Sequence, residues 1–477
     1  MGNLDQVNRL GTSRISKLIL EFSIPAIIGL VVNGLYNIID SIFLGHGVGT
    51  VGIATATIAL PIMTLSIAVS LLVGAGGNAL VALRLGEGKF KEAEKVLGNA
   101  FVLTLVFAVV LTALVNIFID PLLTLSGAHE DTWESSHVFI RIISFGFILQ
   151  FFGMGFNNFI RTAGDPNRAL YTMIAGTVVC IVFNYLFVIQ FGWGVAGSAW
   201  ATVIGQGVSA VLVLWYFVFS KRAPFKLRIP CLRLSSRLVR SICALGSASF
   251  FLQFAGAIVS LILNNQLSFY GDLSEITGVG AQAAIGVVNR VAMFAFFPVL
   301  GVAIAVQPIF GYNYGAQDFK RVKITFRLAF YWMAIIGSFF WLLIHILPSQ
   351  IVSLFAVTEG LKDFTVTAMQ VQMFFMPLIG LQVLAANYFQ SSGQPLRSSF
   401  ISLTRQIIYL IPLLYLLPVM AGSNMFLPGV TSLEAIYYTY PIADVLSLAT
   451  AGVMIMLEWK KLNEKIQKRA AGLSPPH

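Results

Sequence analysis

The sequence predicts an all-α membrane protein with twelve transmembrane helices, arranged as two six-helix lobes that are related by a pseudo-twofold axis along the membrane normal. Three observations lead to this prediction: the composition, the recurrence of long apolar segments and an internal duplication. Of the 477 residues, 57% are hydrophobic and only 10% are charged, and the mean hydropathy is +0.84. Such a chain has too little polar surface to cover a water-soluble globule, so a bilayer must be its solvent.

Apolar segments long enough to cross the hydrocarbon, roughly twenty residues each, recur along the whole chain. Charged or turn-rich segments separate them, and no large soluble domain remains between them. They predict membrane spans at residues 17–44, 53–83, 97–119, 135–160, 169–190, 195–219, 241–270, 278–310, 322–346, 365–390, 398–418 and 435–458.

Basic residues are concentrated in every second connection between the predicted spans. The first, third, fifth, seventh, ninth and eleventh connections hold a single Lys or Arg, Lys362, whereas the others are rich in them, for example Arg84, Arg161, Arg168 and Lys221. Basic connections favour the cytoplasm. We therefore expect a multi-pass protein of the cell inner (cytoplasmic) membrane with both termini cytoplasmic. The formal charge of the chain is +10. We expect its basic residues to interact with the anionic headgroups of membrane lipids, and we expect no nucleic acid as a partner.

Two pairs of connections match at the same sequence offset. Residues 84–91 (RLGEGKFK) resemble residues 313–320 (NYGAQDFK), and residues 164–168 (GDPNR) resemble residues 393–397 (GQPLR). The offset that takes Gly86 to Gly315 also takes Gly164 to Gly393, and we call it the repeat offset. An even number of spans per half predicts parallel repeats with a cleft between two lobes.

The duplication sets the expected domain organisation. We expect an amino-terminal lobe at 1–219, a cytoplasmic linker at 220–240, a carboxy-terminal lobe at 241–460 and a cytoplasmic basic tail at 461–477.

These loops, together with Pro25 and Asp40, resemble the multidrug and toxic compound extrusion (MATE) family of antiporters. The segments 307–316 (QPIFGYNYGA) and 441–444 (PIAD) are similar to its bacterial DinF/MepA-like branch. The resemblance covers essentially all twelve predicted spans. It implies alternating access through a central cleft and multidrug efflux of small amphipathic, cationic substrates by antiport of H⁺ or Na⁺. We expect the transporter to be a monomer.

Asp40 is the main candidate for ion coupling, because ionisable residues inside membrane spans are costly and therefore rare. The helical rise places Asp40 in the outer third of the first span, and Asn37 lies one turn below it on the same face. Asn184 in the fifth span and Thr202 in the sixth reach a similar depth, so the four side chains could converge. Alternatively, Asp40 is only a buried, hydrogen-bonded contact between helices.

The resemblance implies a proton or sodium site on the first, fifth and sixth helices, which here means Asp40, Cys180, Asn184 and Thr202. Many relatives carry Asn and Asp where this chain has Cys180 and Asn184. The chain therefore lacks a carboxylate and a hard oxygen ligand that Na⁺ would prefer, by analogy with other hard cations. This departure favours protons, with Na⁺ as the alternative at Asp40. We expect no resident metal and no cofactor.

Three further charges lie in the predicted carboxy-terminal spans: Arg290, Arg405 and Asp444. All three can reach the middle third of the membrane, where a mutual ion pair is the cheapest arrangement. We interpret them as a charge network that locks the second lobe, with a direct role in coupling as the alternative. Pro25 frees a backbone carbonyl in the first span, which permits a hinge there.

Other functions fit the sequence less well. A lipid or oligosaccharide-lipid flippase of the same broader superfamily remains the alternative, although its cavity should be more cationic than two mid-depth arginines allow. A membrane-embedded enzyme would need clustered His, Asp, Glu or Ser, which the spans do not supply, so we expect no catalytic residues. The chain has no Walker A motif and no ion-filter motif of a channel. An ion gradient is therefore the expected energy source.

Overall fold

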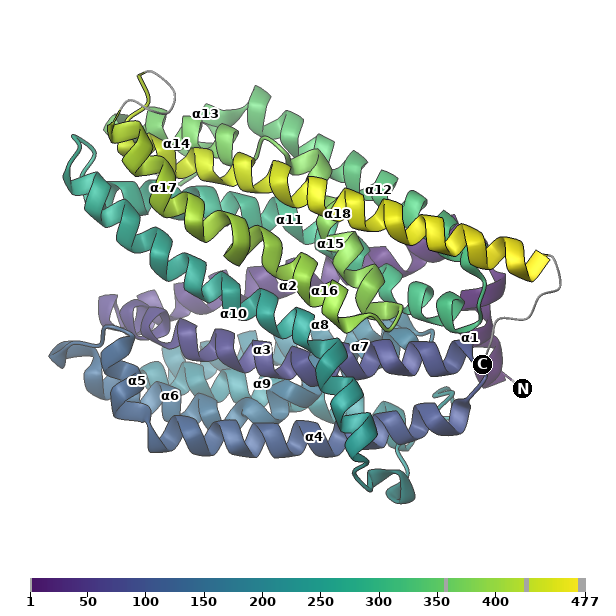
Figure 1. The fold of residues 1–477 in the computed structure, drawn as a ribbon. Coiled ribbons are helices and arrows are strands. Elements are labelled where there is room, and N and C mark those ends of the chain that lie inside the picture. The colour runs from purple at the N-terminus through teal and green to yellow at the C-terminus, as the bar shows by residue number, and fades with distance from the viewer. Residues whose placement is uncertain (1, 356–358, 424–428, 471–477) are drawn as a thin grey trace. The chain divides into compact units, whose positions relative to one another are not determined.

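The computed structural model describes residues 2–355, 359–423 and 429–470. All regular elements in these ranges are helices (Figure 1). Eleven of the described helices are long and apolar enough to cross a membrane, and one bent pair brings the number of spans to as many as twelve. The predicted all-α membrane fold is therefore confirmed.

The first half of the chain forms the helices of the first six spans and the short elements between them. Three segments are π-helices or 3₁₀-helices and are labelled η. The elements are α1 (Gly2–Thr12), α2 (Ile15–Gly47), α3 (Thr50–Gly86), α4 (Phe90–Ile117), α5 (Ile119–Leu125), α6 (Glu130–Gln150), η1 (Phe151–Gly155), α7 (Asn157–Thr162), α8 (Pro166–Asn184), η2 (Tyr185–Gln190), α9 (Gly194–Val218) and η3 (Ile229–Leu232).

The second half begins at Ser236. Its elements are α10 (Ser236–Asp272), α11 (Gly278–Gly315), α12 (Phe319–Ile346), α13 (Pro348–Ser353), α14 (Glu359–Gln372), α15 (Met376–Ser391), α16 (Pro395–Leu403), η4 (Thr404–Leu410), α17 (Ile411–Gly422) and α18 (Ser432–Ala470).

The tenth predicted span is not one straight helix. Residues 360–372 and 376–391 form two helices that meet at an angle of 48°. Pro377 is the second residue of the helix that follows the break. Since proline lacks an amide hydrogen and its ring crowds the carbonyl four residues earlier, here that of Met373, the helix cannot continue undisturbed through this point.

Helix contacts divide the chain into two compact units. The first contains residues 1–253, 305–322 and 390–395, and the second contains residues 254–304, 323–389 and 396–477. The end of α11 and the connection from α15 to α16 thus belong to the first unit. The predicted lobe boundaries, which follow the sequence repeat, stay a prediction.

The first unit is a helical bundle whose described residues include two apolar clusters. In it, α8 packs against α2 and α9, and α6 packs against α3, α4 and α9 (Figure 1). One cluster contains Phe156, Phe159 and Val7 of α1, and the other contains Phe139 and Phe147. We call the end of this unit that carries Arg84, Arg161, Arg168 and Arg222 the basic end.

The predicted linker at 220–240 is fastened to α4. The carboxylate of Glu94 accepts a hydrogen bond from the Lys226 amide at 3.2 Å and pairs with Arg228 at 3.4 Å. Asn99 donates to the Arg233 carbonyl at 3.2 Å and accepts from the Ser235 amide at 2.8 Å. Residues 220–240 therefore lie along the first unit and are held to it by hydrogen bonds, and we call this segment the strap. The helix α10 begins within the strap, at Ser236.

The predicted basic tail begins as helix. The last helix, α18, continues to Ala470, so residues 461–470 extend it beyond the twelfth predicted span. Residues 471–477 of the predicted tail lie outside the described residues.

The backbone supports the duplication. Gly164 and Gly393 both have positive φ, 88° and 77°, which is the conformation that only glycine adopts readily. Gly88 and Gln317, which are related by the same repeat offset, have φ of 76° and 58°. Equivalent turns therefore share a backbone conformation even where their residues differ.

Gly86 and Gly315 mark a close helix crossing within the first unit. A Cβ on Gly86 of α3 would lie 2.0 Å from the Tyr312 carbonyl oxygen of α11, and a Cβ on Gly315 would lie 2.2 Å from the Leu83 carbonyl oxygen. Leu83 and Tyr312 are themselves related by the repeat offset. The contact of Gly86 with Tyr312 is thus repeated, with the two halves exchanged, by the contact of Gly315 with Leu83. A twofold axis produces such a reciprocal pair of contacts. The axis therefore passes between α3 and α11 here.

Candidate functional site

Asp40 of α2 lies at a polar contact of three helices. Its carboxylate oxygen Oδ1 accepts one hydrogen bond from Asn184 Nδ2 of α8 at 2.6 Å and one from Ser198 Oγ of α9 at 2.7 Å. Asn184 and Ser198 are buried, whereas Asp40 is half-buried. The packing of α8 against both α2 and α9 brings the three side chains together.

The local helix geometry helps to place Asn184. The helix α8 begins at an N-cap, Asp165, whose carboxylate accepts a hydrogen bond from the Arg168 amide at 3.3 Å. It ends at Asn184, where the wider π-helix η2 begins. Such π-turns often occur at functional sites because they alter the direction of neighbouring side chains.

Cys180 and Thr202 form a second polar contact one helical turn away. Cys180 precedes Asn184 by four residues and Thr202 follows Ser198 by four, so each pair shares a helix face. The Cys180 thiol donates to Thr202 Oγ1 at 3.9 Å. Close approach of the helices permits both contacts, since a Cβ on Gly205 of α9 would lie 2.6 Å from Cys180 Cβ.

The structure thus brings four of the candidate residues into two adjacent layers. Asp40 contacts Asn184 directly, and Cys180 contacts Thr202. The fifth candidate, Asn37, lies on α2, but its side chain is outside the described residues.

Asn184 has an unused acceptor. Its Oδ1 is buried and receives no hydrogen bond from any described residue. An unsatisfied buried polar atom costs on the order of 1–3 kcal/mol. A proton on Asp40 or a cation beside it would supply the missing partner.

Ser198 is the residue of this site that the sequence analysis missed. A serine hydroxyl does not stand out in an apolar segment, because it can bond to its own helix backbone. Its position one turn before Thr202, on the face that meets α8, is the signal that could have found it.

In the second unit, Arg405 and Asp444 form an ion pair. Arg405 Nε lies 2.5 Å from Asp444 Oδ1, and the two side chains are 23% and 2% exposed. Arg405 stands in the π-helix η4. Arg290 of α11 is exposed and makes no ion pair with any described residue. The structure therefore shows a pair where the sequence suggested a network of three.

Pro25, the predicted hinge, is buried inside α2, which is a continuous helix from Ile15 to Gly47.

A chain of amides crosses the first unit near the glycine crossing. Asn78 Nδ2 of α3 donates to Gln307 Oε1 of α11 at 3.4 Å, and Thr162 donates to Asn78 Oδ1. Gln307 Nε2 donates to Gln390 Oε1 at 2.9 Å, and Gln390 Nε2 donates to the Leu245 carbonyl at 2.7 Å. All of them lie in the first unit.

Asn78 and Gln307 are also related by the repeat offset, so they are equivalent positions of the two halves that meet at the axis. Neither residue stands out in the sequence, because neither carries a charge. Applying the repeat offset to the polar residues inside the spans would have found the pair.

The comparisons with known proteins agree with the duplicated fold. The MatE family model matches the chain twice, at residues 25–186 and 254–416, and the two matches begin at positions related by the repeat offset. A solved structure described as the outward-facing conformation of a multidrug resistance MATE family transporter of the MOP superfamily has a TM-score of 0.87 and 22% identity. It covers 97% of this chain and 99% of its own.

Two curated relatives align over almost their whole length. The probable multidrug resistance protein YoeA of Bacillus subtilis is 24% identical over 449 residues, 92% of this chain and 93% of the relative. The multidrug export protein MepA of Staphylococcus saprophyticus is 22% identical over 458 residues, 94% of this chain and 99% of the relative. Since the family model covers well over half of the residues, in both halves, the chain belongs to the multidrug and toxic compound extrusion (MATE) family of membrane transporters.

Proposed function

We propose that this protein is a secondary active exporter of small amphipathic, cationic compounds, driven by cation antiport with H⁺ favoured over Na⁺. The observation that carries the proposal is Asp40, a carboxylate inside a membrane-spanning helix that is held by Asn184 and Ser198. The names of the relatives, a multidrug export protein and a probable multidrug resistance protein, support the substrate class. The basic connections support a cell-membrane orientation with cytoplasmic termini.

The hydrogen-bonding pattern supports the proton as the coupling ion. Ionised Asp40 only accepts hydrogen bonds, whereas protonated Asp40 carries a hydroxyl that can donate. The unused Oδ1 of Asn184 is then a suitable acceptor, so that acid and amide form two hydrogen bonds with each other. Na⁺ would instead need several hard oxygen ligands, and the sulfur of Cys180 offers none.

The energy is sufficient for concentrative export. Exchange of one proton for one monovalent cation moves no net charge, so the pH gradient supplies the energy. Each pH unit releases about 1.4 kcal/mol, which equals the cost of a tenfold gradient of the exported compound.

Alternating access requires that one end of the cleft be closed while the other is open. The amide chain and the glycine crossing hold α3 and α11 together at the basic end of the first unit. Asp40 lies near the end of α2, which runs antiparallel to α3, and therefore toward the opposite end. In our proposal the basic end is the cytoplasmic gate, and a change in Asp40 protonation bends α2 at Pro25 when that gate opens.

The test is efflux from proteoliposomes with ethidium as the probe. Under an imposed pH gradient without Na⁺, we expect the wild type to transport and Asp40→Asn, which cannot ionise, to lose gradient-driven efflux. Asp120→Asn is the matched control, because that carboxylate is 68% exposed and should tolerate the change. Full gradient-driven efflux by Asp40→Asn would show that the coupling assignment is wrong.

A second variant tests the choice of ion. Asn184→Asp places a second carboxylate beside Asp40, which should favour a hard cation over a single proton. We expect efflux by this variant to increase with Na⁺ at constant pH, while wild-type efflux does not respond. A wild-type protein that responds to a Na⁺ gradient alone would argue for sodium coupling.

A further inference from the structure

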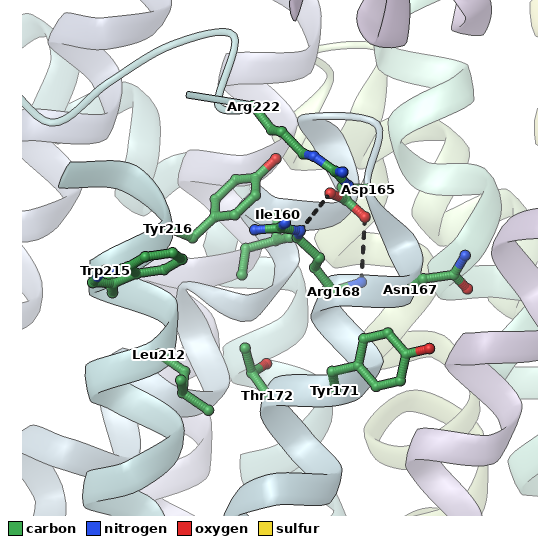
Figure 2. A pocket seen from close by; sticks show the side chains of 10 residues that line it. All are labelled: Ile160, Asp165, Asn167, Arg168, Tyr171, Thr172, Leu212, Trp215, Tyr216 and Arg222. Carbon is green, nitrogen blue, oxygen red and sulfur yellow. Dashed lines mark hydrogen bonds and ion pairs between the residues drawn. The ribbon is translucent and has the colours of Figure 1, made fainter. Parts of the chain in front are cut away.

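A pocket on the first unit lies apart from the Asp40 site. It has a volume of about 480 Å³ and lies between the start of α8 and the end of α9, at the basic end (Figure 2). Thr172, which lines the pocket, precedes Asn184 by twelve residues on α8, which corresponds to roughly 18 Å of helix. The pocket is therefore independent of the proposed ion coupling.

Two arginines and one aspartate supply the charges of the pocket. Arg168 Nε lies 3.3 Å from Asp165 Oδ2, so this carboxylate neutralises one guanidinium. Arg222 also lines the pocket and makes no ion pair with any described residue. In Figure 2 the Asp165 carboxylate lies beside both guanidinium groups, and one negative charge cannot neutralise two positive ones. The pocket therefore carries a net positive charge and suits an anion.

Tyr216 contributes a donor that lacks a partner. The residue is 2% exposed, and its hydroxyl forms no hydrogen bond with any described residue. Arg168 Cζ lies 5.8 Å from the centroid of the Tyr216 ring, and the Tyr216 hydroxyl points toward the Arg222 guanidinium (Figure 2). Since a guanidinium only donates hydrogen bonds, an oxygen-rich anion between the two groups would satisfy both.

The surroundings of the pocket are apolar and exposed. Tyr171 and Trp215 line it and are 66% and 51% exposed. Val211 of α9 and Phe219, which directly follows α9, are 64% and 69% exposed. Exposed Trp and Tyr between apolar residues and arginines are typical of the level where lipid headgroups begin. This combination of apolar and charged surroundings suits a ligand that carries both an apolar chain and a charged headgroup.

We propose that this pocket binds the phosphate of an anionic phospholipid. Arg168, Arg222 and Tyr216 contact the phosphate oxygens, and the acyl chains lie along Trp215 and Leu212. Basic pockets between membrane helices are known to recognise anionic headgroups. A zwitterionic lipid fits less well, because its positive amine would meet a site that is already positive.

The experiment is native mass spectrometry of the full chain, with binding measured separately for dioleoyl phosphatidylglycerol, dioleoyl phosphatidylcholine and inorganic phosphate. We expect the wild type to bind phosphatidylglycerol more tightly than the other two. Tyr216→Phe, which removes only the hydroxyl, and Arg222→Gln should each weaken that binding about tenfold, or about 1.4 kcal/mol, because each variant loses a hydrogen bond to the charged phosphate.

Two matched controls remove the same groups elsewhere. Tyr415→Phe removes a hydroxyl from a side chain that is 52% exposed, and Arg233→Gln removes an exposed charge of the strap; both should bind phosphatidylglycerol like the wild type. Unchanged binding in both Tyr216→Phe and Arg222→Gln would overturn the site. Inorganic phosphate that binds as tightly as phosphatidylglycerol would overturn the lipid as its occupant.

Discussion

Asp444 is a carboxylate with 2% of its side chain exposed, and its ion-pair partner is Arg405. Removing such a group from water costs several kcal/mol, which the attraction of a close partner offsets. Loss of one partner is then worse than loss of both, because it leaves a buried charge without compensation.

This asymmetry gives a prediction for the second unit. Asp444→Asn should lower the stability by on the order of 3 kcal/mol, and Asp444→Leu combined with Arg405→Met should recover much of that loss. Thermal unfolding in detergent measures the first quantity, and efflux per folded molecule measures any effect on transport. Asp363→Asn, an exposed carboxylate in the same unit, is the control. If Asp444→Asn instead abolished transport at unchanged stability, the pair would belong to the coupling machinery.

Residues of the candidate site differed in how well the sequence predicted them. Asp40 and Asn184 stood out because polar groups are rare inside apolar spans, and the helical rise gave their depth. The direct contact that the structure shows between them agrees with that placement, although the role in coupling stays a prediction. Ser198 and the Asn78–Gln307 pair could not be singled out, because uncharged side chains cost little enough to occur in spans without a function.

Gly86 and Gly315 allow α3 and α11 to approach each other closely where the two helices cross. We expect Gly86→Ala and Gly315→Ala to destabilise the protein, because the new methyl groups would lie 2.0 and 2.2 Å from carbonyl oxygens of the facing helix, well inside contact distance. Backbone atoms cannot swing aside as a flexible side chain can. Thermal unfolding of the purified variants measures the loss.

Gly452→Ala in α18 is the control for both variants. Its Cβ would have no neighbour within 4 Å, so the only expected change is the better helix propensity of alanine, up to ~1 kcal/mol in favour of the fold. Equal unfolding temperatures for all three variants would contradict the close crossing.

The sequence predicted the helices better than it predicted their irregularities. Hydropathy locates a span because burial in lipid requires about twenty apolar residues, whatever the local geometry. It does not report the break before Pro377, because prolines occur in other spans without one: α3 passes through Pro61 as a continuous helix. The strap at 220–240 was read as a plain linker because its hold on α4 depends on Glu94 and Asn99, which lie far away in the sequence.

For the whole molecule, the proposed cycle requires that the basic end of the first unit open and close. Ser249 accepts a hydrogen bond from Gln390 Nε2 at 3.2 Å and can report on this movement as a cysteine. In a variant that lacks Cys180, Cys231 and Cys243, we expect Ser249→Cys to react slowly with a membrane-impermeant thiol reagent at rest. The reaction should accelerate at least severalfold when a gradient and substrate drive turnover.

Ser236→Cys, at the exposed start of α10, is the control and should react at the same rate in both conditions. A rate at Ser249→Cys that stays constant during active efflux would contradict opening at this end.

The two-part organisation was visible in the sequence because equivalent turns need equivalent backbone angles, as at Gly164 and Gly393. The sequence did not show which segments belong to each compact unit. The end of α11 joins the first unit through contacts such as Gly311 with Ala82, and no pattern within either segment reveals its partner.

The reciprocal glycine contact also bears on the origin of the chain. Two identical copies of one half could have met through the same crossing as separate subunits, because each glycine faces a backbone carbonyl that any residue can supply. The hydrogen bond from Asn78 to Gln307 has a direction and joins side chains that differ by one methylene group. The two halves have therefore diverged at this pair of equivalent positions, whereas the glycine crossing would already have served a homodimeric ancestor.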